Sequence, residues 1–328
     1  MILYLGVFLL TGSIVVLAGV ALARSANALA EATGVGRVWI GSVLLAAATS
    51  LPEVATDVVA VRLGAPDLAA GDLFGSSMAN MLILAGVDLL MRRQQVLRSA
   101  TLDHALTACL AIILNALAAM FVLLRPTSTV LGVSPATILL ALIYIVGTRA
   151  VYYDTLRAAP VEPEGGDGRP TAPRARPALG RFAAAALVIL LAAPALAWSA
   201  KGIADLSGLG TTFIGTCLVG LATSLPELVS VLAAVRMGAF DLAVGNLFGS
   251  NAFNMVVFLA MDVASPTGAI FAALDPRHAL AALTAIVLMS LGLAAIAYRA
   301  ERRFALIEPG SWLMVAAYLF GLWLLVPQ

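Results

Sequence analysis

The sequence predicts an all-α polytopic membrane protein with ten transmembrane helices, arranged as two inverted-topology five-helix repeats. Three observations predict this fold class: a mean hydropathy of +1.02 over 328 residues, ten apolar stretches near membrane-spanning length, and an internal duplication at an offset of 174 positions. With 62% hydrophobic and 11% charged residues, the chain is far more apolar than a soluble domain. Its net charge of +1 offers no basic surplus for nucleic acid and no acidic tail for a soluble partner.

Apolar runs between charged or Pro/Gly-rich breaks define the ten spans in order. The first begins at "MILYLGVFLL", which has no basic segment before its apolar core, so we expect it to be retained rather than cleaved. The second and seventh spans each contain a Pro-Glu pair, and the third and eighth are rich in glycine, serine and asparagine. The spans are placed near residues 2–23, 38–61, 68–90, 102–124, 131–152, 181–199, 211–235, 242–262, 278–298 and 310–326.

One long polar stretch divides the chain, "RAAPVEPEGGDGRPTAPRARPALGR" at residues 157–181. Its proline, glycine and charge content cannot bury enough apolar surface to order itself. We therefore expect a first five-helix repeat at 1–153, a flexible cytoplasmic linker at 154–180 and a second five-helix repeat at 181–328.

The two halves repeat each other. At the offset of 174, "TSLPEVATDVVAVRLGAPDLAAGDLFGSSMANM" (49–81) aligns without a gap with "TSLPELVSVLAAVRMGAFDLAVGNLFGSNAFNM" (223–255), and 20 of the 33 positions are identical. The same offset pairs Asp88 with Asp262 and His104 with His278. The repeating unit is therefore the whole half rather than one motif.

The odd number of spans in each half requires the second half to enter the membrane upside down. With the N-terminus outside, only four of the 19 basic residues fall outside, namely Arg62, Arg125, Lys201 and Arg277. The positive-inside rule therefore favours N-out, C-out and a cytoplasmic linker. Inverted repeats with a site at their interface are a transporter design, because two mirror-related states can expose one site to each side in turn.

Two glutamates, Glu53 and Glu227, occupy equivalent places in the inverted halves and should meet near the bilayer midplane. An ionised glutamate at this depth costs several kcal/mol unless it is paired, solvated or neutralised, so it points to a function. Each follows a proline that interrupts the helical hydrogen bonds. The break should free backbone carbonyls around Ala46 to Ala48 and Gly220 to Ala222, which a membrane tolerates only against protein or a wet cavity.

Hydroxyl and amide oxygens surround these glutamates in the sequence, one helical turn before them or four residues apart on one face of the partner span. They belong to Thr49, Ser50, Thr223, Ser224, Ser76, Asn80, Ser250 and Asn254. Two bidentate carboxylates and two carbonyls would give about six hard oxygen ligands, which suits Ca²⁺ better than Mg²⁺. No cysteine or histidine cluster accompanies them, so a zinc or copper site is disfavoured.

Charge suggests the mode of transport. An empty site with two negative charges resists reorienting through a low-dielectric core, whereas Ca²⁺ cancels both charges and Na⁺ ions can do so one at a time. A carrier that moves only when it is neutralised is an exchanger. We take this as a hypothesis from charge counting, which a downhill leak of Ca²⁺ without a counter-ion would contradict.

The doubled and inverted pattern "GxxxxAxATSLPE…GxxFGSxxxN" resembles the calcium/cation antiporter superfamily, and within it the sodium/calcium exchanger branch with its two alpha-repeats. The specific motifs occupy roughly residues 36–84 and 210–258, while the ten-span plan covers the whole chain. The proton/calcium branch carries a "GNATE"-like motif where this chain has "TSLPE", which disfavours proton coupling without removing it.

The resemblance implies Glu53 and Glu227 as shared ligands of Ca²⁺ and Na⁺. It implies Asn80 and Asn254 as lining of the central site, and asparagine at the second position argues against potassium dependence. Ligands of flanking Na⁺ sites are implied for Thr49, Ser50, Ser76, Thr223, Ser224 and Ser250, with the backbone carbonyls near Ala46 and Gly220.

Two further acidic residues have open roles. Asp57 lies four residues after Glu53, where the second half has Val231, and it either lines the aqueous approach, relays protons or forms a solvated cavity wall. Asp72 stands where the second half has Asn246, and structural and ion-pathway roles remain equal alternatives.

Two repeat-related pairs have simpler interpretations. Asp67 and Asp241 stand at the starts of their spans, where helix capping and dipole stabilisation explain them. His104 and His278 stand at span entrances and are expected to be interfacial residues rather than pH sensors.

The sequence thus predicts a secondary active cation antiporter that exchanges Ca²⁺ for Na⁺ by alternating access at a midplane site. A proton/calcium antiporter and a passive cation channel are the alternatives. The spans contain no "HExxH" or "GxSxG" motif, so we expect no enzyme. We expect no cofactor beyond the transported Ca²⁺ and Na⁺, no nucleic-acid partner, and a monomer in the lipid bilayer of a prokaryotic inner (plasma) membrane.

Overall fold

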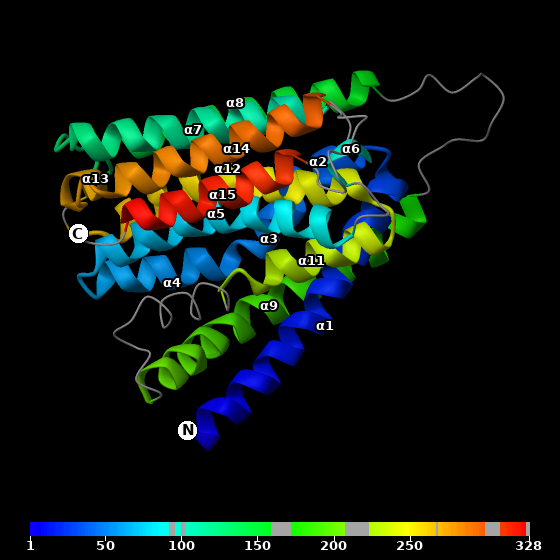
Figure 1. The fold of residues 1–328 in the computed structure, drawn as a ribbon, viewed down its shortest axis with the longest axis horizontal. Coiled ribbons are helices and arrows are strands. Elements are labelled where there is room, and N and C mark those ends of the chain that lie inside the picture. Colours follow the sequence, from blue (N-terminus) through cyan, green and yellow to red (C-terminus); the bar gives the residue numbers. More distant parts are fainter. Residues whose placement is uncertain are drawn as a thin grey trace.

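The computed structural model describes residues 1–91, 96–99, 103–158, 172–206, 223–266, 268–298 and 309–325. Long apolar helices, joined by short connections, make up most of this described part (Figure 1). The first half contains α1 (Ile2–Thr33), α2 (Arg37–Trp39), the π-helical turn η1 (Ile40–Leu45), α3 (Ala46–Thr49), α4 (Leu51–Arg62), α5 (Pro66–Leu90), α6 (Val96–Ser99), α7 (His104–Leu124) and α8 (Pro135–Ala158). The second half contains α9 (Ala172–Leu206), α11 (Leu225–Arg236), α12 (Phe240–Ala264), α13 (Ile270–Ala273), α14 (His278–Tyr298) and α15 (Pro309–Leu325).

These helices match the predicted spans closely. Seven described helices are long and apolar enough to cross a membrane, and α2 to α4 together form a bent span with a 42° break. α15 is a shorter apolar helix of 17 residues at the last predicted span. α11 occupies the second part of the span predicted at 211–235, whose residues 211–222 lie outside the described part.

Two helices are longer than predicted. α1 continues to Thr33 and α9 extends from Ala172 to Leu206. α8 ends at Ala158, so helices reach into both ends of the segment expected to be a linker, and residues 159–171 lie outside the described part.

The first long helices of the two halves, α1 and α9, pack side by side and run obliquely to the other long helices (Figure 1). The rings of Tyr4 and Trp198 have their centroids 4.7 Å apart in this contact. Val15 packs with Ala192, Leu196 and Ala200 in a small apolar cluster that is separate from the main core. This pair of helices is thus attached along one edge of the remaining bundle.

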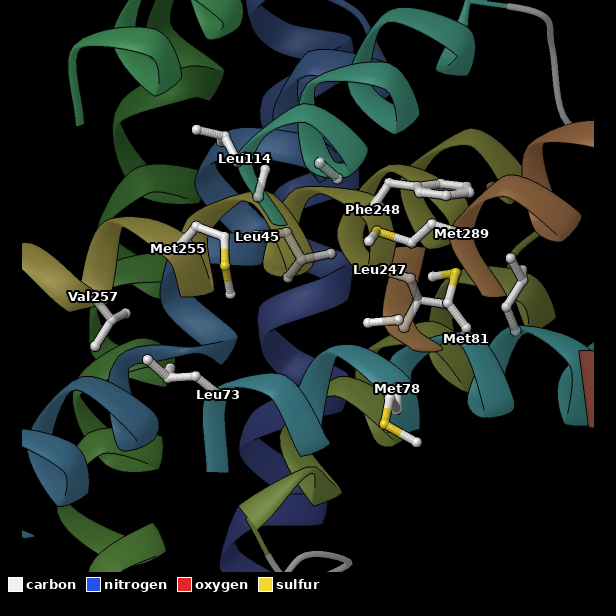
Figure 2. Close-up of a cluster of buried hydrophobic side chains, with 14 of the residues drawn as sticks. Leu45, Leu73, Met78, Met81, Leu114, Leu247, Phe248, Met255, Val257 and Met289 are labelled. Atoms are coloured by element: carbon white, nitrogen blue, oxygen red, sulfur yellow. The ribbon is translucent and has the colours of Figure 1, made fainter. Parts of the chain in front are cut away.

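Both halves contribute to the main core. Figure 2 shows part of it, where side chains of α5 and α12 interdigitate with those of η1, α7 and α14. The labelled side chains are Leu45, Leu73, Met78, Met81, Leu114, Leu247, Phe248, Met255, Val257 and Met289. Close packing of this kind fixes the relative positions of α5 and α12, the two helices that also carry the asparagines of the predicted site.

Two histidine–aspartate pairs join the halves reciprocally. The Nε2 atom of His104 lies 3.0 Å from Oδ1 of Asp241, and Nε2 of His278 lies 3.1 Å from Oδ1 of Asp67. The offset of 174 converts one pair into the other, so the start of α7 meets α12 as the start of α14 meets α5. Such a reciprocal arrangement is what a pseudo-two-fold relation between inverted halves produces.

These pairs correct the predicted capping role. Asp67 and Asp241 do lie in the first turns of α5 and α12, but neither helix has a side-chain cap. The carboxylates instead contact histidines of the opposite half. His104 is fully buried, so it is an interhelical residue rather than an exposed interfacial one.

Asp262, at the end of α12, is a buried tie between the halves. Its Oδ2 accepts hydrogen bonds from the Ser134 amide at 2.6 Å and the Thr137 hydroxyl at 2.8 Å, and its Oδ1 accepts one from the Ile270 amide at 2.8 Å. A single carboxylate thus satisfies three donors, one from the loop before α8 and two from the first turns of α8 and α13.

Asp88, at the end of α5, is the repeat counterpart of Asp262 and also links the two halves by hydrogen bonds. It accepts hydrogen bonds from the Leu97 amide at 3.1 Å and from the Ser311 hydroxyl at 2.8 Å. Ser311 is the repeat counterpart of Thr137. Each half therefore supplies an aspartate to the other half's last span.

Replacing Asp262 with Asn should destabilise the fold strongly. In either orientation the amide nitrogen would confront at least one backbone N–H, that of Ile270 or that of Ser134, and an unsatisfied buried group costs about 1 to 3 kcal/mol. We expect a lower melting temperature in detergent for Asp262→Asn and an unchanged one for Glu31→Gln. Glu31 is the control because its side chain is 61% exposed and contacts Arg37 and Asn27 at the surface. Equal melting temperatures for the two variants would contradict this role of Asp262.

Candidate cation site

Each predicted glutamate lies at the start of a half-helix. α3 ends at Thr49, Ser50 leaves the helical conformation with φ −90° and ψ 6°, and α4 begins at Leu51 with Pro52 in its first turn. The second half repeats this, since Ser224 has φ −82° and ψ 5° before α11. Proline lacks the amide donor that would continue the helix, which explains the break. The positive end of each half-helix dipole then favours a carboxylate in the first turn.

The two carboxylates are buried together between the halves. Glu53 and Glu227 are both 0% exposed, and each stands in the first turn of its own half-helix. Oε1 of Glu227 accepts a hydrogen bond of 3.5 Å from the Ser50 hydroxyl, which comes from the opposite half. The two oxygens of Glu53 and Oε2 of Glu227 have no hydrogen-bond partner among the described residues.

Two asparagine oxygens complete a set of unpartnered acceptors. Oδ1 of Asn80 on α5 and Oδ1 of Asn254 on α12 are buried and also lack partners among the described residues. With the glutamates this makes five buried oxygens without a donor. Buried acceptors are normally satisfied, and unsatisfied carboxylate and amide oxygens are the atoms that a hard cation binds.

Hydroxyl groups from both halves meet beside the carboxylates. The Thr49 hydroxyl lies 3.2 Å from Oδ1 of Asn246 and 3.5 Å from the Ser250 hydroxyl, so the first half's break contacts α12 directly. The hydroxyls of Thr49 and Ser250 also approach the Ala46 carbonyl, at 3.2 and 3.5 Å.

The Ala46 carbonyl differs from the expectation in one respect. We predicted a carbonyl freed by the break, but it also accepts a backbone hydrogen bond of 3.0 Å from Ser50. A carbonyl oxygen has two lone pairs, so it can still face the hydroxyl cluster. The preceding turn η1 is π-helical, a local widening that is frequent at functional sites and that the sequence did not suggest.

The remaining predicted ligands fall into two groups. Ser76 on α5 and the two residues before α11, Thr223 and Ser224, are all buried. Their counterparts in the other half are Ser250, Thr49 and Ser50. Gly220 lies outside the described residues.

Asparagines that sequence reasoning passed over support the site. The Asn80 amide nitrogen donates to Oδ1 of Asn251 at 2.9 Å, and the Asn251 amide nitrogen donates to the Ser77 carbonyl at 3.2 Å. Asn115 on α7 donates to the Asn251 carbonyl at 3.2 Å. This network fixes the nitrogen of Asn80 and leaves its oxygen unpartnered. The signal for Asn115 was a single polar residue within "AIILNALAAM".

The composition of the cluster limits what it can bind. No group of three or more histidine, cysteine, aspartate or glutamate side chains is arranged to hold a metal ion within the described ranges. A cation between Glu53 and Glu227 would therefore be held by two carboxylates and by neutral oxygens. Oxygen ligands of this kind favour hard cations such as Ca²⁺ and Na⁺ over soft transition metals.

Comparison with known protein families gives matches in both halves. Residues 3–152 and 177–326 match the family model described as sodium/calcium exchanger protein. The putative antiporter CaxA of Alkalimonas amylolytica is 28% identical over 274 residues, which cover 82% of this chain and 83% of the relative. The inner membrane protein YrbG of Escherichia coli (strain K12) is 26% identical over 311 residues, which cover 91% of each chain.

A third relative matches over a shorter length. The sodium/calcium exchanger MaX1 of Methanosarcina acetivorans is 38% identical over 90 residues, which cover 25% of this chain and 26% of the relative. Among solved structures, the sodium-calcium exchanger NCX_Mj soaked with 100 mM Na⁺ and 10 mM Sr²⁺ is similar, with a TM-score of 0.72 at 22% identity over 98% of each chain. This likeness shows that the two proteins share one fold of about ten helices in two repeats.

Proposed function

Since the chain belongs to the sodium/calcium exchanger protein family and is a membrane cation antiporter rather than an enzyme, we propose that it exchanges Ca²⁺ for Na⁺ at the site between its halves. The observation that carries this proposal is the pair of buried glutamates, one from each half, with three carboxylate oxygens that no described donor satisfies. A charged group in the membrane interior requires such a partner, and a transported cation supplies it.

The ligands divide into a central and a flanking set in this proposal. Glu53 and Glu227 bind either ion, and Asn80 and Asn254 complete the central site through their unpartnered oxygens. The flanking Na⁺ sites are formed by Thr49, Ser50, Ser76, Thr223, Ser224 and Ser250 with the carbonyls of Ala46 and Gly220. The contacts of Thr49 with Asn246 and Ser250 support the flanking Na⁺ site beside the helix break of the first half.

Electrostatics supports exchange over simple uptake. With the site empty, two like charges face each other in a low-dielectric interior, which opposes any rearrangement that desolvates them further. One Ca²⁺ or two Na⁺ remove the net charge. The protein therefore changes its access from one side to the other only when loaded, which couples the two ions. NCX_Mj, which has the same fold, has been solved after soaking with Na⁺ and Sr²⁺ and after soaking with Na⁺ and Ca²⁺.

We further propose the membrane orientation that the basic residues predict. The N-terminus and C-terminus lie outside, and the linker at 154–180 between repeats 1–153 and 181–328 lies in the cytoplasm of a prokaryotic cell. The E. coli relative is named an inner membrane protein, which supports the inner membrane as the location. A monomer suffices because both glutamates come from one chain.

Radiolabelled Ca²⁺ uptake into proteoliposomes tests the exchanged ions. We expect uptake when Na⁺ is loaded inside and diluted outside, and none with a pH gradient alone or with no gradient. Uptake driven only by the pH gradient would make the chain a proton/calcium antiporter. Uptake with no counter-ion gradient would make it a passive channel, and either outcome would overturn the proposal.

A further inference from the structure

The first half carries two carboxylates beyond the central pair. Asp57 on α4 lies four residues after Glu53, so both project from one helix face. Asp72 on α5 lies four residues before Ser76 and eight before Asn80, on the face that contributes to the central site. These two aspartates are absent from the ligand set described above.

The hairpin of α4 and α5 brings Asp57 and Asp72 to the same level. The two helices pack against each other and are joined by the short turn at residues 63–65. Asp57 lies five residues before the end of α4 and Asp72 six residues after the start of α5. Residues at matched distances from the turn of an antiparallel helix pair lie at the same level along the pair, which places Asp57 and Asp72 at one depth on two helices that pack together.

The Asp57 carboxylate has no partner where it lies. Its side chain is 2% exposed and its Oδ2 has no hydrogen-bond partner among the described residues. No described lysine, arginine or histidine forms a salt bridge with Asp57 or Asp72. An ionised carboxylate in a membrane interior is costly unless its charge is balanced, and a bound cation balances it. Asp72 is half-buried.

The second half lacks this feature at the equivalent level. Val231, 1% exposed, stands at the position of Asp57. Asn246 stands at the position of Asp72, and its oxygen accepts the Thr49 hydroxyl at 3.2 Å. The acidic pair is therefore confined to one side of the central site, the side of the 63–65 turn, which the predicted orientation makes extracellular.

We propose that Asp57 and Asp72 form an accessory site for a divalent cation, one helical turn to the extracellular side of the central site. The two pairs of carboxylates, one at each level, together carry four negative charges, and one Ca²⁺ ion at each pair would balance them. The accessory site has fewer buried oxygens than the central site, so it should bind Ca²⁺ more weakly and present it to the central carboxylates from outside. This inference rests on the proposed function, because the same ion occupies both sites.

Equilibrium dialysis of the purified full chain with radiolabelled Ca²⁺ in Na⁺-free buffer tests this site. The wild type should bind about two Ca²⁺ per chain, one tightly and one weakly, as two carboxylate sites of different ligand number require. The variant Asp57→Val with Asp72→Asn gives the first half the residues of the second. It should lose the weak class and keep the tight one, whereas Glu53→Gln with Glu227→Gln should lose the tight class.

The outcomes separate this inference from the proposed function. Retention of both classes by the Asp57→Val, Asp72→Asn variant, or a single class in the wild type, would overturn the accessory site and leave the exchanger intact. A wild type that binds no Ca²⁺ would overturn the proposed function and the accessory site with it. If the first variant does not fold, Asp57→Asn with Asp72→Asn preserves side-chain volume and must give the same loss of the weak class.

Discussion

Replacing Glu53 with Gln should abolish Na⁺-driven Ca²⁺ uptake while the protein remains folded. Gln keeps the shape of the side chain but removes one of the two charges that balance Ca²⁺. Removing one partner of a buried ion pair costs about 3 to 5 kcal/mol, and each 1.4 kcal/mol is tenfold in affinity. We therefore expect Ca²⁺ affinity, measured by equilibrium dialysis, to fall about 100-fold or more.

Two matched variants control this experiment. Glu227→Gln changes the repeat-related residue and should produce a loss of the same size, because both carboxylates are fully buried at one site. Glu31→Gln makes the same chemical change on an exposed side chain and should transport Ca²⁺ at the wild-type rate. Retained exchange in Glu53→Gln, with normal folding, would contradict the ligand assignment.

Replacing Gly249 with Ala should also slow transport strongly, for a steric reason. A Cβ at Gly249 on α12 would overlap the backbone of Ser42 in η1, with Cα of Ser42 at 2.5 Å. Backbone atoms cannot rotate away, so α12 and η1 would have to separate. That shift would move Ser250 from Ala46 and Thr49, which it contacts at 3.5 Å. Overpacking costs about 1 to 3 kcal/mol, and small residues are what allow membrane helices to approach so closely.

Gly86→Ala on α5 is the control for this substitution. A Cβ at Gly86 meets no described atom within 4 Å, and the second half already carries Ala260 at the matched position. We expect Gly249→Ala to lower the melting temperature and reduce the initial rate of Na⁺-driven Ca²⁺ uptake at least about tenfold, the equivalent of 1.4 kcal/mol. Gly86→Ala should leave both unchanged. Equal behaviour of the two variants would show that the close approach at Gly249 has no functional importance.

Structural features that depend on a single segment of the sequence, such as the spans and the helix breaks, were predicted well. Apolar runs of about 20 residues fix the spans because a bilayer demands that length. The proline before Glu53 predicted the broken helix because a missing amide has a local effect, and the described helices bend there by 42°. The exact offset between the halves predicted equivalent positions for Glu53 and Glu227 before any contact was known.

Features that depend on contacts between distant residues were not predictable from one sequence. Asp67 and Asp241 look like helix caps because they stand at helix starts. Their carboxylates contact His278 and His104, residues more than 130 positions away in the sequence. A local pattern cannot choose between a cap and such a partner, since both need an aspartate in the first turn.

The polar network around Asn80 was missed for a related reason. Asn115 is a lone polar residue in an apolar span, and nothing in its own segment shows which helix it faces. Asn251 stands where the first half has Ser77, and this difference does not show which helix it contacts. Its hydrogen bonds to Asn80 and Ser77 depend on how α5 and α12 pack, which is decided by the core between the halves.

Anomalous diffraction from crystals soaked in Sr²⁺ without Na⁺ tests the central claim most directly. One Sr²⁺ peak should lie between α4 and α11, with carboxylate oxygens of both Glu53 and Glu227 at about 2.3 to 2.6 Å, the range of Ca²⁺ ligands. A strongest peak bound by only one of these glutamates, or lying away from both, would contradict the account.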